Sequence, residues 1–563
     1  MRLAQITAEG FRNLAGEIAL PEPLTLIAGE NNTGKSNVID ALRLLTQPYA
    51  GSRFNRWITS DDFAHDGHGN RLVDSFELEA LYVGLTDEER GRFVTCLAPS
   101  VRHDAARIRL VAQLREGGRV NPIWYGGDSL QPGVEPWARE AVLHTYLPAL
   151  RDAEADLKPG RANKLVNLLR SLAPEGSDAR TEIETVATSS NANLEATAAV
   201  SKAKTEIQGR LDRVLGPLFK QTTGLRFTDP RFERVIGALW ALAGDMDALE
   251  LAENGLGFNN LLYMATLLAA ITNDPPEDGL HLLLVEEPEA HLHPQLQDLL
   301  MRYLEGEAGA KTQVVVTTHS PTFAAASGVE RMTVMTRAGA GQPIVGRSPG
   351  SFGLEKKALD HLRRFLDVTK ASLLFARGVI LVEGIAEQLL LPQLATRSGV
   401  SLSDAGVSIV NVGGVSFAPF AALFSSEHLP YRCAIVSDGD PPKKAELDIE
   451  LEGGEPLLSA TAQKLKANET DTLRVFLAER TFEWDLAKAG NWETLIQALA
   501  LVKPKLANSL SPQKDGRPDA LLDAVENSKG RFAQALTEVL ADDRDFVVPQ
   551  YLVDAINWAA NKL

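Results

Sequence analysis

The first residues with recognisable chemistry form a loop at positions 29–36 with the pattern GxxxxGKS. An apolar run at 24–28 precedes this loop, and a helix-like pattern of apolar residues at 38–45 follows it. A strand, a glycine loop and a helix in this order bind phosphates through backbone N–H groups and the positive end of the helix. We therefore predict an ATP site whose contacts are Gly29, Asn31, Asn32, Gly34, Lys35 and Ser36. In this site Lys35 reaches the β- and γ-phosphates, and the Ser36 hydroxyl holds one Mg²⁺.

Two adjacent carboxylates follow a second apolar run, at 282–285. In a phosphate-loop enzyme, Glu286 would hold Mg²⁺ or its water, and Glu287 would polarise the attacking water. A further apolar run at 314–318 ends at His319, which we expect to contact the γ-phosphate. His291 and His293 are two positions apart and have no third metal ligand nearby. This spacing favours a loop that contacts another subunit over a metal site.

Four more carboxylates follow apolar runs in the last third of the chain. Glu383 comes directly after the run 379–382, and Glu387 lies one helical turn later. Asp438 and Asp440 flank a glycine shortly after the apolar run 434–436. Parallel strands place ligands at their carboxyl edge, where converging carboxylates repel one another unless cations lie between them. We predict a site for two Mg²⁺ or Mn²⁺ ions that hydrolyses phosphodiesters, although either motif alone could be an acidic surface turn.

These residues need α/β elements to bring them together. Apolar runs that alternate with helical patterns predict parallel sheets, and thus an α/β fold class. The predicted buried strands are 280–285, 313–318, 379–382, 407–412 and 434–436. Outside this pattern, 1–20 predicts a strand pair, and 71–83 and 107–114 predict alternating strands. The Pro- and Gly-containing segments 121–135 and 503–530 are interpreted as connections.

A segment from about 154 to 222 has a different character. Val200, Ile207, Leu211, Leu215 and Leu218 recur at helical spacing, with charged residues between them. The pattern predicts a helix, which could be an ordinary core helix or a helical insertion that pairs two subunits. The sequence leaves both interpretations open.

Composition limits the classes of protein. With 563 residues, 44% hydrophobic and 23% charged, the chain is an ordinary multidomain globular protein. A net charge of −17 argues against a broad non-specific nucleic-acid coat, but bound metal ions and a local basic groove remain compatible with a DNA enzyme. Two isolated cysteines and the lack of a long apolar stretch lead us to expect a cytoplasmic protein without a membrane segment.

The nucleotide motifs together resemble the ATP-binding-cassette (ABC) ATPases of chromosome maintenance and recombination. In that superfamily, a signature loop of one subunit completes the ATP site of another. The corresponding segment here is 253–260, which implies that Asn254, Gly255 and Gly257 contact the nucleotide. The segment lacks the usual Ser-Gly-Gly, and Glu286 stands where an Asp is usual.

The acidic motifs resemble the Toprim domain, and the whole combination resembles the OLD (overcoming lysogenization defect) family of ATP-dependent nucleases. Segments 146–153 and 286–294 also look like that family. Segment 480–486 resembles its late acidic motif, which implies that Glu483 is a further metal ligand. Segment 528–533 resembles its late lysine motif, so Lys529 would neutralise charge on the scissile phosphate. A solvated lysine is the alternative interpretation.

The resemblance implies four parts. Residues 1–153 and 223–368 would form an ABC-type ATPase, 154–222 a helical insertion for dimerisation, and 369–563 a Toprim nuclease domain. The expected protein is an ATP-hydrolysing, metal-dependent DNA endonuclease of anti-phage defence, acting as a homodimer or higher homo-oligomer. Some members of the family work with a helicase-like partner. The alternatives are a DNA repair or recombination clamp without nuclease activity, a topoisomerase and a primase.

Overall fold

The computed structural model describes residues 1–49, 57–66, 68–115, 117–149, 157–159, 164–215, 221–243, 249–273, 279–309, 311–337, 341–414, 416–440, 458–513, 515–541 and 545–561. Part of the predicted segment 146–153 and the predicted helix position Leu218 lie outside these residues. The described chain contains two large sheets with parallel strands, which confirms the α/β class.

The first of these sheets has seven strands in the order β14-β13-β3-β12-β11-β8-β4. Its strands are β3 (Leu24–Ala28), β4 (Gln47–Pro48), β8 (Val142–Leu147), β11 (Leu280–Glu286), β12 (Thr312–Thr318), β13 (Met332–Arg337) and β14 (Ile344–Arg347). Pairing is parallel except between β13 and β14. The central strands β3 and β11 are buried along their whole length, which explains why they are continuous apolar runs in the sequence.

An antiparallel sheet packs beside the seven-stranded one, in the order β2-β1-β5-β6-β7. Its strands are β1 (Arg2–Glu9), β2 (Gly16–Ala19), β5 (Ser75–Val83), β6 (Ala106–Leu114) and β7 (Val120–Gly126). The interpretation of 121–135 as a connection is therefore wrong in its first part. Pro122 lies in β7 at the edge of the sheet, where a missing backbone donor is tolerated.

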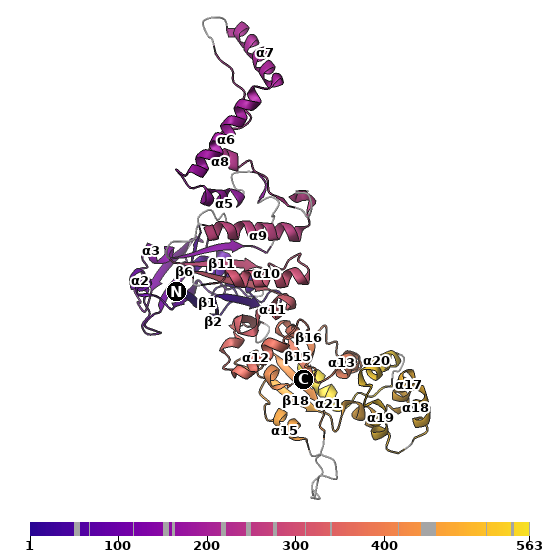
Figure 1. Cartoon of the computed structure of the whole chain (residues 1–563). Coiled ribbons are helices and arrows are strands. Elements are labelled where there is room, and N and C mark those ends of the chain that lie inside the picture. Colours follow the sequence, from indigo (N-terminus) through magenta and orange to yellow (C-terminus); the bar gives the residue numbers. More distant parts are fainter. Residues whose placement is uncertain are drawn as a thin grey trace.

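Helices cover the seven-stranded sheet and extend away from it (Figure 1). The helices of this part are α1 (Lys35–Leu45), α2 (Asp87–Arg92), α3 (Pro136–Glu140), α5 (Lys164–Leu172), α6 (Asp178–Glu195), α7 (Ala198–Leu215), α8 (Phe232–Ile236), α9 (Leu256–Asn273), α10 (Pro294–Glu307), α11 (Pro321–Ser327) and α12 (Lys356–Phe365). Helices α5 to α8 project far from the sheets at the top of Figure 1. The helix predicted around Val200 to Leu215 is present as α7, and none of its residues is buried. None of the helices that the structure describes combines the length and apolar character of a transmembrane segment.

The second large sheet is entirely parallel, in the order β16-β15-β17-β18. Its strands are β15 (Gly378–Val382), β16 (Val407–Asn411), β17 (Arg432–Ser437) and β18 (Leu473–Leu477). The helices around it are α13 (Ile385–Arg397), α14 (Ala418–Ala421), α15 (Ala460–Lys466), α16 (Phe482–Lys488), α17 (Trp492–Val502), α18 (Pro504–Leu510), α19 (Arg517–Val525), α20 (Lys529–Leu540) and α21 (Gln550–Ala559). The interpretation of 503–530 as a connection is wrong for most of its length, because Pro504 and Pro518 lie in the first turns of α18 and α19, and Pro512 alone lies between the two helices.

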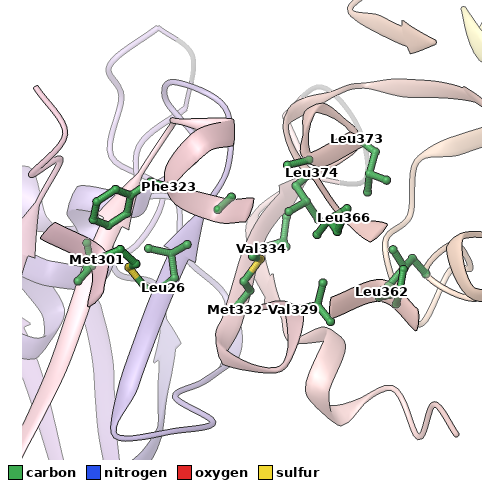
Figure 2. Packing of buried hydrophobic residues seen from close by; sticks show 14 of the residues in the cluster. Leu26, Met301, Phe323, Val329, Met332, Val334, Leu362, Leu366, Leu373 and Leu374 are labelled. Atoms are coloured by element: carbon green, nitrogen blue, oxygen red, sulfur yellow. The ribbon is translucent and has the colours of Figure 1, made fainter. Parts of the chain in front are cut away.

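Each large sheet separates two apolar cores, because successive side chains of a strand point to opposite faces. In β15, Ile380 and Val382 face the helices of the C-terminal part, whereas Val379 and Leu381 belong to a core that also includes β3, β11 and α12. Figure 2 shows part of this shared core, with Val334 of β13 near Leu366 and Leu374. The two sheets are therefore joined by one continuous apolar layer.

Candidate functional site

The phosphate loop connects β3 to α1 and lies next to a carboxylate at the end of β11. Gly34 has a φ of +75° as the N-cap of α1, a conformation that favours glycine. A cavity of about 520 Å³ lies over the loop, and its lining residues are Asn13, Asn31, Asn32, Gly34, Lys35, Ser36, Asn37 and Glu287. Five of the six predicted loop contacts line this cavity, and Gly29 lies behind them with its carbonyl on Lys35.

Lys35 is folded back onto the loop. Its Nζ donates hydrogen bonds of 2.9 Å to the Gly29 carbonyl and 2.7 Å to the Glu30 carbonyl. Burial lowers the pKa of Lys35, while the nearby charges of Glu287, Glu289 and Glu30 act in the opposite direction. An ammonium group held among carboxylates at the loop is well placed to exchange its carbonyl partners for phosphate oxygens.

Glu286 is the last residue of β11 and is buried. The hydroxyl of Tyr146, on the neighbouring strand β8, donates a hydrogen bond of 2.7 Å to its Oε2. The guanidinium of Arg43 in α1 lies 3.9 Å from the centroid of the Tyr146 ring. Burial raises the pKa of Tyr146, and the negative charge of Glu286 raises it further, so the phenol stays a donor. These contacts fix the orientation of the carboxylate that we predict to serve Mg²⁺.

Glu287 and His319 lie together at the ends of β11 and β12. Nδ1 of His319 is 3.4 Å from Oε1 of Glu287, and the φ of Glu287 is +41°, an uncommon value for a residue other than glycine. The backbone N–H of His319 donates to Oε1 of Glu289 at 3.1 Å, and the Thr318 hydroxyl donates to the same oxygen. Glu289 thus holds the turn that carries His319, and burial raises the pKa of Glu289.

The residues of the predicted signature loop, Asn254, Gly255 and Gly257, are not among the residues that line this cavity. Nδ2 of Asn254 donates to the Ala243 carbonyl at 2.6 Å, and Gly255 precedes helix α9. Gly257 packs so closely on the loop after β11 that an added Cβ would lie 2.6 Å from the His291 carbonyl oxygen. The structure therefore joins this segment to the loop after Glu287, and its predicted contact with a nucleotide stays a prediction.

A second group of charged side chains lies at the carboxyl edge of the β15–β18 sheet. Glu383 follows β15 and is exposed, Glu387 lies in the first turn of α13, and Asp438 follows β17. Glu483 in the first turn of α16 is 1% exposed, and Nζ of Lys529 lies 3.0 Å from its Oε2. The structure thus places the two late sequence predictions, Glu483 and Lys529, next to each other.

The electrostatics of this acidic site show that its carboxylates are crowded. Burial raises the pKa of Asp438 to about 8, and the charges of Glu387 and Glu483 raise it while that of Lys529 lowers it. Burial also raises the pKa of Glu387, with further contributions from Glu483 and Glu383. A cation among these groups would favour their charged forms, and an all-oxygen donor set suits Mg²⁺ or Mn²⁺. The chemistry of these oxygen donors therefore suits divalent metal ions.

Asp440 ends the second acidic motif. It is exposed with a φ of +40°, and its backbone N–H donates to the Arg480 carbonyl at 3.1 Å. Gly439 before it packs against β18, since an added Cβ would lie 2.4 Å from the Ala478 carbonyl oxygen. Across the part of the chain that the structure describes, no three His, Cys, Asp or Glu side chains form a group that could hold a metal ion. The assignment of metal ligands therefore stays a prediction.

Two residues of the nucleotide site have contacts that the sequence did not reveal. Tyr146 pairs with Glu286 only because β8 lies beside β11, with Tyr146 opposite Leu284 in the register. Glu289 is the second carboxylate after β11, and the neighbouring Glu286 and Glu287 were the signal in the sequence that could have identified it. Both roles depend on pairings between distant segments.

Comparison with known proteins finds two domain families in the chain. The AAA ATPase domain matches residues 144–324, and the TOPRIM domain of overcoming lysogenization defect protein-like proteins matches residues 374–440. The OLD nuclease of Thermus scotoductus is 24% identical over 434 residues, which are 73% of this chain and 77% of that protein. The Old nuclease of Escherichia phage P2 is 22% identical over 438 residues, covering 74% and 73% of the two chains. Endonuclease GajA of Bacillus cereus is 23% identical over 369 residues, covering 55% and 53%.

These matches confirm the predicted resemblance and the α/β fold class, with an ATPase part followed by a Toprim part. The TOPRIM match includes Glu383, Glu387, Asp438 and Asp440. An ATPase domain and a Toprim domain imply that the chain uses a nucleotide and a divalent metal.

Proposed function

We propose that this chain, which joins an AAA ATPase domain to an OLD-like TOPRIM domain, is an ATP-hydrolysing, metal-dependent DNA endonuclease. The observation that carries the proposal is the gathering of Glu387, Asp438, Glu483 and Lys529 at the carboxyl edge of one parallel sheet. Relatives named OLD nuclease and Endonuclease GajA support DNA cleavage as the reaction.

In the proposed nuclease site, Glu383, Glu387, Asp438, Asp440 and Glu483 hold two Mg²⁺ or Mn²⁺ ions. The chemistry that such ions supply when bound is activation of water and neutralisation of charge on the leaving oxygen. Lys529 keeps Glu483 oriented through their 3.0 Å ion pair and adds positive charge for a bound phosphate. The backbone N–H of Phe482 donates to Oδ1 of Asp438 at 2.9 Å, which fixes that carboxylate at the end of β17.

In the proposed ATPase site, the loop 29–36 and Lys35 bind the phosphates. Ser36 and Glu286 hold the Mg²⁺ that accompanies ATP, and Tyr146 orients Glu286. Glu287 polarises the attacking water, and His319, 3.4 Å from Glu287, contacts the γ-phosphate. Asn254, Gly255 and Gly257 would complete the ATP site of a second subunit.

We also propose that the chain self-associates through the helical insertion and serves in anti-phage defence. The lack of buried residues in α7 supports the first point, because its apolar row stays uncovered within one chain. The second point and a helicase-like partner rest on the resemblance to the OLD family alone.

The nuclease proposal is tested by incubating supercoiled plasmid with the protein and Mg²⁺ or Mn²⁺. We expect the wild type to convert plasmid to nicked or linear forms, and Asp438→Asn to lower the rate by about 100-fold or more, because one carboxylate of the site is lost. The exposed Asp404→Asn, in the same domain, is the matched control and should cut like the wild type. Binding of Mn²⁺, followed by electron paramagnetic resonance, should weaken in Asp438→Asn alone. Equal cutting by Asp438→Asn and wild type would refute the site, and no cutting by any of them would refute the nuclease activity.

A further inference from the structure

The phosphate loop touches the C-terminal sheet through one ion pair. Nε of Arg377 lies 3.3 Å from Oε1 and 3.1 Å from Oε2 of Glu30, although the two residues are 347 positions apart. Glu30 is the second residue of the GxxxxGKS loop, and Arg377 immediately precedes β15. The contact therefore joins the segment that binds phosphates to a central strand of the Toprim sheet.

On the nucleotide side, the backbone of Glu30 is hydrogen-bonded to Lys35, the residue that we propose to bind phosphate. Its carbonyl accepts hydrogen bonds of 2.7 Å from Nζ of Lys35 and 2.7 Å from the Thr33 hydroxyl. A triphosphate in the loop competes for the Lys35 ammonium, because charged phosphate oxygens are stronger acceptors than carbonyls. Loss of the Lys35 bond changes the restraints on Glu30, and with them the position of its carboxylate.

On the nuclease side, Arg377 is anchored to a rigid strand. Its backbone N–H donates to the Gly406 carbonyl at 2.9 Å, and the next residue, Gly378, is so close to α21 that an added Cβ would lie 2.1 Å from the Ala559 carbonyl oxygen. Strand β15 is completely buried and lies between β16 and β17. A displacement at its start is passed along the strand to Glu383, which follows its end.

Glu30 also faces the start of the neighbouring strand. Burial raises the pKa of Tyr431, and the negative charge of Glu30 raises it further, which places the carboxylate within electrostatic range of the residue before β17. Strand β17 ends next to Asp438. The Glu30 side chain therefore lies at the amino ends of the two strands whose carboxyl ends carry Glu383 and Asp438.

We propose that the Glu30–Arg377 ion pair couples nucleotide occupancy of the phosphate loop to events at the acidic site. This inference rests on the proposed function, because the coupled event is DNA binding and cleavage. The side chains of Arg377 and Glu30 are 72% and 29% exposed. An ion pair this exposed adds little to folding stability, so its removal should change communication between the sites without unfolding the chain.

The experiment compares Glu30→Gln, Arg377→Gln and the charge-swapped pair Glu30→Arg with Arg377→Glu. Two ratios are measured: the DNA cleavage rate in Mn²⁺ with and without a non-hydrolysable ATP analogue, and the Kd of a fluorescent ATP analogue with and without plasmid DNA. Coupling between two bound ligands changes both affinities by the same factor, so the ratio of nucleotide Kd values should differ from one by about five-fold in the wild type. The ratio of cleavage rates should also differ from one, but it need not have the same size, because rates are not bound by this reciprocity. We expect each single variant to bring both ratios to within about two-fold of one, and the swapped pair to regain the wild-type ratios.

Arg363→Gln is the matched control, since Arg363 is 60% exposed and pairs with Glu330 outside the phosphate loop. It should keep both wild-type ratios, and melting curves should show all variants folded. Wild-type ratios in both single variants, or ratios of one in the wild type, would overturn the coupling. If the wild type does not cut DNA but DNA still changes its nucleotide Kd, and Arg377→Gln loses that change, the nuclease proposal fails while the coupling stands.

Discussion

Single side chains orient the carboxylate at the end of β11, which we propose to hold Mg²⁺ or its water. The Tyr146 hydroxyl donates to buried Glu286, and the Arg43 guanidinium packs on the Tyr146 ring. The hydrogen bond holds Oε2 of Glu286 in place at the end of β11. Partners of this kind commonly change metal affinity or activity when they are removed.

We predict that Tyr146→Phe lowers ATP turnover by about 10- to 100-fold and raises the Mg²⁺ concentration needed for half-maximal turnover, because Glu286 loses its donor. Phosphate release measured over a Mg²⁺ titration checks both effects. Tyr303→Phe, which changes a half-exposed hydroxyl on α10, should behave like the wild type. Glu287→Gln should abolish turnover at every Mg²⁺ concentration, which separates loss of the base from loss of metal. An unchanged Mg²⁺ titration in Tyr146→Phe would show that the hydrogen bond has no part in the reaction.

Residues that follow apolar runs, such as Glu287, His319 and Glu383, could be predicted from the sequence. The end of a buried strand can be recognised from a short segment of the chain. It did not reveal Tyr146 as a partner of Glu286, nor Arg377 as a partner of Glu30. Those contacts depend on which strands become neighbours and on how two domains pack. Asp440 follows β17 as predicted and is exposed, and its place among the metal ligands stays a prediction.

At the scale of elements, β8 and β11 carry two buried histidines between them. His281 is 1% exposed and its Nε2 lies 3.0 Å from the Thr145 hydroxyl, while Nδ1 of His144 lies 2.8 Å from the Thr46 hydroxyl. Burial lowers the pKa of His281 to about 4 and that of His144 to about 3. Both rings are therefore neutral in the folded state, whereas in the unfolded chain they take up protons near pH 6.5.

We predict that acid weakens folding through these histidines. Their lowered pKa makes the unfolded chain bind more protons below about pH 6.5, so stability is complete above that pH and falls as the pH drops toward 4. For His281 alone, the loss should reach about 2–3 kcal/mol near pH 4. Urea unfolding of His281→Gln, which can keep the bond to Thr145, should show a flatter pH dependence than the wild type. The exposed His68→Gln should match the wild type, and parallel curves for all three proteins would contradict the prediction.

Elements were predicted well where both faces of a strand are buried. Strands β11, β12, β15 and β17 are continuous apolar runs because helices or a second sheet cover both faces. The errors arose where Pro and Gly were taken as signs of a loop. In β7 the proline lies on a sheet edge, and in α18 and α19 prolines begin helices, positions that only the tertiary arrangement distinguishes from turns.

At the scale of the whole molecule, helices α6 and α7 extend away from the sheets (Figure 1). Ile207 and Val214 are 45% and 82% exposed and lie two helical turns apart on α7. The sequence left open whether this helix belongs to a core. Its exposure within one chain favours pairing between subunits, while the predicted boundaries at 153, 222 and 368 stay predictions.

We predict that the combined change Ile207→Asp and Val214→Asp shifts the protein toward monomers, because carboxylates in an apolar interface lose hydration without a partner. Light scattering coupled to size exclusion measures the mass directly. Lys202→Asp makes a matched change of charge at an exposed, polar position of the same helix and should leave the mass unchanged. An unaltered mass in the double variant would place the subunit contact elsewhere.

The apolar layer between the two large sheets limits how the two parts of the chain can be exchanged by recombination. Leu362 of α12 and Leu366, which follows that helix, pack in the same layer as Ile435 of β17, so both parts of the chain contribute side chains to it. Gene exchange that brings in a foreign C-terminal half replaces one side of a close-packed layer, and the recombinant folds only when the incoming side chains fill the same volume. We therefore expect the ATP-using and DNA-cutting halves to pass between genomes as a single block.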